Sequence, residues 1–352
     1  MNHRLLIAAM GSLCLLAGCG SGGTGNTGTS SSGSGGSTTN KMVLGYYTGD
    51  ATSAASATSV SVPVTAVSMD VIGVNADGSL TGALPVNLMD SETSLKRASY
   101  AVVSNFGATD FDPALAHSAM VTNRAATVDS IAMLAQTQGL AGINIDFEGL
   151  DVSDRDNYTT FITDLAQALH AEGSTLMLSV PAKSADDPND TWSWPYDYAA
   201  LSSQADLIQV MTYDEYVPGY GPGPVDGSDW MQACLKYAAT QIPADKILLG
   251  LPAYGYDYDT TASTGAAVTW KDVPALLNST GATAQWDGTS NSPFFDYTDS
   301  KGDTHEVWYE DAKSIQLKSG YAVSLNLRGV SMWALGDEDA SFWTAVEAGL
   351  HP

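Results

Sequence analysis

Short apolar runs alternate with amphipathic stretches along most of this chain. That alternation is typical of repeated βα units, which build a parallel sheet or barrel. We therefore expect an α/β fold, a (β/α)8 barrel, with a helix at about residues 154–170 and a last helix at about 341–349. The eight predicted strands, in chain order, are residues 42–47, 66–74, 98–106, 141–148, 175–180, 205–213, 246–254 and 329–335.

The interval between the last two predicted strands is too long for a simple connection. It mixes Gly, Ser, Thr and Asp with aromatic residues that include Trp270, Trp286, Phe294, Phe295, Tyr297 and Trp308. We expect a small α+β insertion at about residues 259–311. Two interpretations stay open: the insertion lines one side of a cleft, or it is a surface excursion with a small core of its own.

The fourth predicted strand has the clearest polar pattern. Ile143, Ile145 and Phe147 fall on one face, and Asn144, Asp146 and Glu148 fall on the other. In a parallel barrel the apolar face meets the helices and the polar face looks into the lumen. The acids would then end the strand at the carboxyl end of the barrel, where such barrels hold their chemistry. A surface strand with solvated acids is the alternative.

The spacing of the two acids indicates acid catalysis. Two positions apart on a strand, Asp146 and Glu148 have Cα atoms about 6.6 Å apart on one face. Two carboxyls so close in a partly dry site cannot both ionise freely, so one keeps its proton near neutral pH. A protonated Glu beside an ionised Asp suits general acid catalysis at a glycosidic oxygen.

The segment Ala141-Gly-Ile-Asn-Ile-Asp-Phe-Glu148 resembles the strand-4 signature DGxDxDxE of glycoside hydrolase family 18. The resemblance implies that Glu148 is the catalytic acid and that Asp146 orients the acetamido group of the substrate. Asn144 replaces the middle Asp, as in the spore-cortex and LysM-associated branch of the family. Ala141 replaces the first, and both departures leave open a sugar-binding lectin on the same barrel that has lost catalysis.

Two later segments resemble the same family in the expected order. Residues 211–214, Met-Thr-Tyr-Asp, resemble its strand-6 element, which implies that Tyr213 is catalytic and holds the acetamido group. Trp333 matches the strand-8 Trp on which the sugar at the cleaved bond stacks. Either aromatic could instead belong to the barrel core. The resemblance also implies substrate-binding roles for Tyr46, Asn105, Asn144, Met211, Asp214 and Tyr254.

This resemblance implies substrate-assisted, retaining cleavage of β-1,4-linked N-acetylglucosamine polymers. It requires no cofactor and no metal. The segment Val307-Trp-Tyr-Glu-Asp311 resembles spore-cortex and LysM-linked members, which favours peptidoglycan as substrate, and chitin or its oligosaccharides are the rival. The five His residues have no metal-ligand spacing. With a net charge of −25, the chain is not expected to bind nucleic acid or anionic membranes.

The N-terminus has the features of a processed signal. Arg4 precedes an apolar run, and residues 16–19, Leu-Ala-Gly-Cys, resemble a bacterial lipobox. We predict a lipoprotein signal peptide at residues 1–18, a lipidated Cys19 and a Gly/Ser/Thr-rich tether to residue 40. The barrel would occupy residues 41–352 as a monomer in the cell envelope, on the outer membrane where two membranes exist, or extracellular, with membrane contact only through the lipid.

Overall fold

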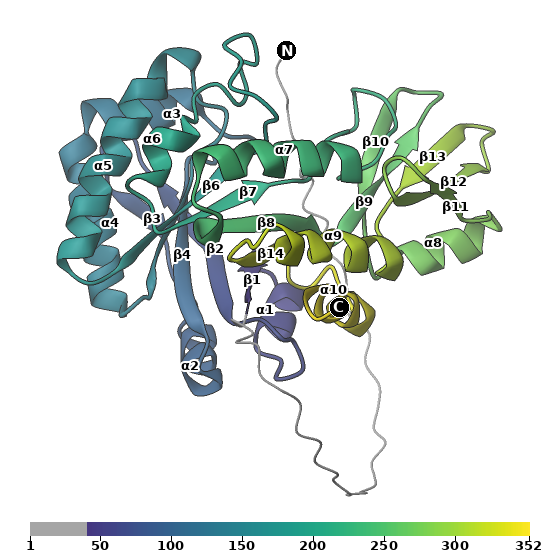
Figure 1. The fold of residues 1–352 in the computed structure, drawn as a ribbon, viewed down its shortest axis with the longest axis horizontal. Helices are drawn as coiled ribbons and strands as arrows, with labels where there is room; N and C mark the ends of the chain where they lie inside the picture. Colours follow the sequence, from purple (N-terminus) through teal and green to yellow (C-terminus); the bar gives the residue numbers. More distant parts are fainter. Residues whose placement is uncertain (1–40) are drawn as a thin grey trace, which may run out of the picture.

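The computed structural model describes residues 41–352, so the predicted signal peptide, Cys19 and the tether lie outside the described residues. Eight parallel strands form a barrel, as Figure 1 shows. β1 pairs with both β2 and β14, which closes the sheet on itself and confirms the predicted (β/α)8 barrel. The barrel strands are β1 (Met42–Tyr47), β2 (Ala66–Val74), β4 (Ala98–Ser104), β5 (Gly142–Asp146), β6 (Thr175–Pro181), β7 (Leu207–Met211), β8 (Ile247–Pro252) and β14 (Gly329–Trp333).

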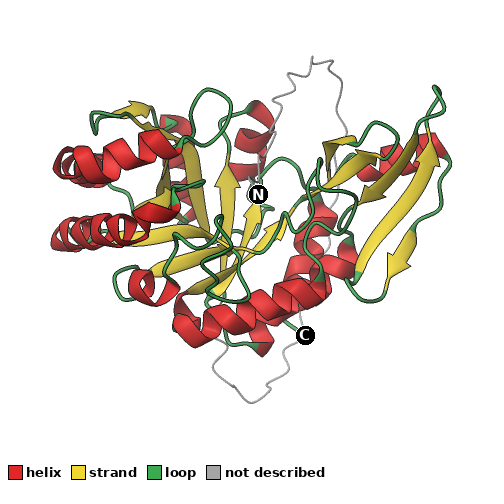
Figure 2. Ribbon diagram, turned by 90° about the horizontal axis from the view of Figure 1, so that it is seen from above, coloured by secondary structure: helices red, strands yellow, loops and turns green. Residues whose placement is uncertain are grey.

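Helices surround these strands, as Figure 2 shows. The longest is α5 (Arg155–Ala171), which buries Phe161, Leu165 and Leu169 completely, one helical turn apart. This helix confirms the one predicted at about residues 154–170. The other helices are α1 (Ala51–Ala57), α2 (Val86–Leu95), α3 (Pro113–His117), α4 (Arg124–Gln138), α6 (Tyr198–Ser202), α7 (Ser228–Gln241), α9 (Ala312–Ser324) and α10 (Ala340–Leu350).

The apolar core divides into two compartments. One lies between the strands and the helices and includes Ile143, Ile145 and Phe147. A second, smaller compartment fills the barrel interior, with Leu44 and Val102 among its members. The alternation along β5 therefore works as predicted: its apolar side chains face the helices and its polar side chains face the lumen.

A five-stranded antiparallel sheet is inserted between β8 and α9, at the right of Figure 1. Its order is β10-β9-β13-β12-β11, and a helix, α8 (Val273–Thr280), packs on one face over Phe295 and Val307. The insertion thus has the small core that one interpretation required. Its strands are β9 (Tyr254–Asp259), β10 (Thr264–Thr269), β11 (Gln285–Asp287), β12 (Ser292–Thr298) and β13 (Thr304–Trp308).

The strand ends differ from the predicted ones where the chain enters the loops of the carboxyl end. The strand predicted at residues 205–213 is shorter, because β7 stops at Met211. The strand predicted at 246–254 ends at Pro252, and Tyr254 already begins β9 of the insertion. The hairpin partner β3 (Leu80–Gly82) and helix α2 were not predicted. β3 is three residues long, which is too short for a period-2 pattern to be recognised.

Gly142, at the start of the signature strand, leaves no room for a side chain. A Cβ atom there would lie 2.3 Å from the carbonyl oxygen of Thr175 on the neighbouring strand. We expect Gly142→Ala to lower the free energy of unfolding by about 1–3 kcal/mol, the usual cost of overpacking. Urea unfolding measures it. Gly288→Ala is the control, because its added Cβ meets nothing within 4 Å; equal losses in the two variants would contradict the steric account.

Candidate active site

The two acids of the signature lie at the carboxyl end of β5, as predicted. Asp146 is the last residue of the strand, and Glu148 follows two positions later. Their exposed fractions are 6% and 8%, so both carboxyls are largely withdrawn from water. Phe147 between them points the other way and stacks on Phe161 of α5, with ring centroids 5.6 Å apart. The strand end is therefore fixed from its apolar side.

Side chains from two neighbouring loops form hydrogen bonds with the backbone of residues 147–148. The side-chain amide of Asn105 donates to the carbonyl oxygen of Glu148 at 2.8 Å and accepts from the Glu148 backbone N–H at 2.8 Å. The Tyr196 hydroxyl donates to the carbonyl oxygen of Phe147 at 2.7 Å. Asn105 was predicted to bind substrate. In this structure it orients Glu148 instead, because both ends of its amide are engaged with the backbone.

Beneath the acids, polar side chains from four strands form a hydrogen-bonded layer in the lumen. The Asn144 amide donates to the Tyr46 hydroxyl at 2.8 Å and to Ser68 at 3.3 Å, and it accepts from Ser179 at 3.3 Å. Tyr46 and Asn144 are 2% and 0% exposed. The two residues thus lie in this buried layer of the lumen, and their contact with substrate stays a prediction.

Burial and like charge keep protons on the two acids. Burial, reinforced by the Asp70 carboxylate, raises the pKa of Asp146 to about 8. Burial also raises the pKa of Glu148 well above its usual range, and the charges of Asp146 and Asp214 add to the effect. Asp70 lies on β2 and was not predicted; a β-bulge between Asp70 and Ile72 interrupts the strand register there, a feature common near active sites.

Tyr213 and Asp214 form the side of the site that faces the insertion. Asp214 has a left-handed backbone (φ 61°), and its carboxylate accepts hydrogen bonds from Tyr254 and Tyr256, each at 2.7 Å. The Tyr213 ring meets Tyr254 edge-on, with centroids 6.4 Å apart. Tyr256 was missed, although the period-2 tyrosines at 254, 256 and 258 gave a signal. The insertion therefore also lines the cleft, as the other interpretation required.

The two remaining predicted residues end strands β14 and β7, which lie on either side of β8 in the barrel. Trp333 is the last residue of β14, is half-buried, and lies 5.4 Å from the Tyr46 ring. It packs against both the lumen core and the tyrosines of the insertion. Met211 ends β7 and is also half-buried. The predicted residues therefore gather at one end of the barrel, with Asn105, Tyr46 and Asn144 behind the others.

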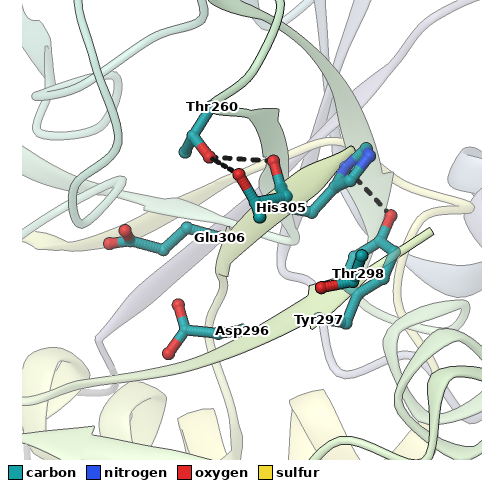
Figure 3. A pocket seen from close by; sticks show the side chains of 7 residues that line it. Thr260, Asp296, Tyr297, Thr298, His305 and Glu306 are labelled. Carbon is teal, nitrogen blue, oxygen red and sulfur yellow. Dashed lines mark hydrogen bonds between the residues drawn. The ribbon is translucent and has the colours of Figure 1, made fainter. Parts of the chain in front are cut away.

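A shallow pocket of about 310 Å³ lies elsewhere, on the insertion (Figure 3). Asp296 and Glu306 point to one side of it, and Tyr297 and His305 point to the other. His305 is held by Asp257 at 2.8 Å. The pocket contains none of the predicted site residues.

Within residues 41–352, no three His, Cys, Asp or Glu side chains are grouped to hold a metal ion, and no helix is long and apolar enough to cross a bilayer.

A proton-bearing Glu beside a second buried carboxyl, flanked by Tyr and Trp at the mouth of a barrel, defines a glycosidase. The comparisons with known proteins also indicate a glycosidase. Residues 42–339 match the model of glycosyl hydrolases family 18. The chain belongs to this family.

Individual relatives cover nearly the whole chain. It is 39% identical over 314 residues to an uncharacterised glycosylase, YvbX, of Bacillus subtilis, covering 88% of this chain and 91% of the relative. A chitinase structure from Chromobacterium violaceum superposes with a TM-score of 0.85 at 39% identity, covering 89% of this chain and 99% of the other. The spore cortex-lytic enzyme SleL of Bacillus megaterium gives 0.80 at 26% identity, covering 88% and 74%.

The raised pKa of Glu148 predicts that this buried carboxyl destabilises the fold as the pH rises. Between the ordinary Glu pKa of about 4.3 and the higher folded value, the native state binds more protons than the unfolded state, so stability falls as pH rises. Glu148→Gln removes this dependence. We expect its melting temperature to exceed that of the parent at pH about 8 and the difference to shrink at pH about 4. Differential scanning calorimetry at both pH values measures this, and a constant difference would contradict it.

Proposed function

We propose that this protein hydrolyses β-1,4-linked N-acetylglucosamine polymers by substrate-assisted, retaining catalysis. The observation that carries the proposal is the buried, proton-bearing Glu148 next to Asp146 at the carboxyl end of β5. Family membership supports it. Of the other residues of the signature, Asp146 would hold the substrate in place.

In the first step, the oxygen of the substrate's own acetamido group attacks C1. The bond from C1 to the leaving oxygen breaks, and Glu148 transfers its proton to that oxygen. Asp146 and Tyr213 would hold the acetamido group. The positive charge that develops on the cyclic intermediate favours the ionised form of Asp146, which would then stabilise that charge. The buried Oδ1 atom of Asp146, which has no hydrogen-bond partner among the described residues, is available for the acetamido N–H.

In the second step, Glu148 acts as the base. It takes a proton from a water molecule whose oxygen attacks C1 and reopens the ring of the intermediate. The product keeps the configuration of the substrate, and Glu148 regains its proton. Trp333 would pack against the C–H face of the sugar at the cleaved bond. Both chitin and peptidoglycan offer the required N-acetylglucosamine unit, and the relatives named a chitinase and a cortex-lytic enzyme support one each.

We expect Glu148→Gln to abolish most turnover, because general acid catalysis contributes about 10²- to 10⁴-fold. Chitin oligosaccharides and purified peptidoglycan would be incubated with the parent and the variant, and products read by mass spectrometry. Glu172→Gln, an exposed carboxyl at the end of α5, is the matched control. Near-normal turnover by Glu148→Gln would refute the assignment. Binding without cleavage by the parent would favour the lectin alternative.

We also propose that the protein is a lipoprotein of the bacterial cell envelope, which rests on the lipobox-like residues 16–19 and the tether that follows. The thiol of Cys19 would carry the lipid. In cells, Cys19→Ser should shift the protein from the membrane fraction to the soluble fraction, with Cys234→Ser as the control. Fractionation and immunoblotting measure the shift. Equal membrane association of Cys19→Ser and the parent would contradict the anchor.

A further inference from the structure

Part of the positive charge of this protein lies at the end of the barrel opposite the predicted site. Five basic residues come directly before strands β1, β4, β8 and β14, at the end of the barrel opposite the site: Lys41, Lys96, Arg97, Lys246 and Arg328. Acids follow the strands at the other end, where the catalytic carboxyls lie. A substrate that approaches Glu148 therefore meets several carboxyls, and acids such as Asp206 and Asp245 lie at the opposite end as well.

Carboxylates dominate the electrostatics of Glu148 itself. The charges that act on it come from Asp146, Asp214, Asp70 and Asp110, on four different strands or the loops that follow them, and all are acidic. Asp110 is half-buried in the loop after β4, where it accepts a hydrogen bond from the backbone of Phe111.

The insertion adds two more carboxylates on the same side. Glu306 pairs directly with Tyr258 and with Asp296, so these three side chains share one face of the sheet. Tyr256, two positions from Tyr258, shares that face and bonds to Asp214 in the site. Asp296 and Glu306 point together in Figure 3, away from His305.

The basic side chains near the site are already engaged by the protein. Arg155 is bonded to Asp186 and Asp197 at 2.7 and 2.8 Å, and Lys183 also bonds to Asp186 at 2.7 Å. Both reach backbone carbonyls of the loop after β6 as well.

Lys318 and Lys271 are the other two basic residues near the site, and they are also bonded within the protein. Lys318 is fully buried between Asp226 and Glu310, at 2.5 and 2.7 Å. Lys271 donates to the carbonyl oxygen of Gly336 beside Asp337. These four cations are thus committed to internal partners, and none is placed to receive a substrate carboxylate.

We propose that the cleft selects glycan chains by charge, accepting uncharged N-acetylglucosamine units beside the cleaved bond and disfavouring units that carry a free carboxylate. This rests on the proposed hydrolase function and deepens it. Lactyl ethers and peptide stems of peptidoglycan bring such carboxylates, whereas chitin-type chains do not. A carboxylate brought into this cleft loses water and meets like charge without a counterion.

The test uses two oligosaccharides of one shape. One carries a lactyl ether with a free carboxylate on the sugar next to the cleaved bond, and the other carries the same ether as its methyl amide. Like charges at about 8 Å change affinity by roughly 2- to 30-fold each, depending on the local dielectric. We expect kcat/KM for the carboxylate at least about tenfold below that for the amide at about 10 mM salt, and a smaller gap at about 500 mM.

Asp110→Asn keeps the hydrogen-bond acceptor of Asp110 and removes its charge. Because Asp110 also acts on Glu148, the quantity to compare is the ratio of the two kcat/KM values. Asp110→Asn should raise kcat/KM for the free carboxylate relative to that for the amide about 2-fold or more at low salt. Asp129→Asn, the same change on the outer helix α4, should affect neither substrate. Equal kcat/KM for the two substrates, or a gap that does not change with salt, would overturn charge selection and, in the second case, assign the preference to shape.

Binding of the same pair to Glu148→Gln, measured by calorimetry, keeps this test separate from the proposed function. If the parent cleaves neither the amide nor a chitin oligosaccharide, the hydrolase proposal fails, and the two dissociation constants still report whether charge decides binding. Tighter or equal binding of the free carboxylate would overturn the inference even where the hydrolase proposal holds.

Discussion

The site depends on keeping a protonated carboxyl out of water at the end of a parallel strand. Burial is the largest cause of the raised pKa of Glu148, and it is produced by structure on all sides. Phe147 anchors the strand end to α5, and Asn105 clamps the backbone of Glu148 itself. Hydrogen bonds to its backbone orient Glu148, so its carboxyl oxygens are not needed to hold the residue in place. They remain available for the proposed proton transfer to the glycosidic oxygen.

Two buried lysines bind residues of the loops that follow β6 and β7. Lys183 donates to the carbonyl oxygen of Tyr196, whose hydroxyl in turn holds the carbonyl oxygen of Phe147. Lys318 ties Asp226, at the end of the loop that begins with Asp214, to α9. A buried ion pair adds little net stability, because desolvation offsets the attraction. Such pairs do define geometry, and here each one fixes a loop that reaches the site.

The barrel and the signature could be predicted from the sequence because both rest on local patterns. Alternation at residues 143–148 determines which face each side chain takes, whatever surrounds the strand. The roles of Asn105 and Tyr256 could not be predicted, since each depends on a partner distant in the chain: Glu148 for one and Asp214 for the other. Asp70 gave no signal because a lone acid in an apolar strand acquires meaning only when the barrel closes. The family resemblance predicted which residue types to expect at the strand ends. The hydrogen bonds then show which of these side chains, such as Asn105, are engaged with the protein backbone.

The same dependence on charge links the catalytic acid to the choice of substrate. The carboxylates that keep a proton on Glu148 act through space, so they also act on any charge that the substrate brings to the site. A nearby cation that bound a substrate carboxylate would also lower the pKa of Glu148, so a smaller fraction of Glu148 would carry the proton that the proposed reaction needs. Engaging Lys183 and Lys318 with internal acids avoids this conflict. The raised pKa of Glu148 and the proposed preference for uncharged glycans would then be two consequences of one arrangement of charges.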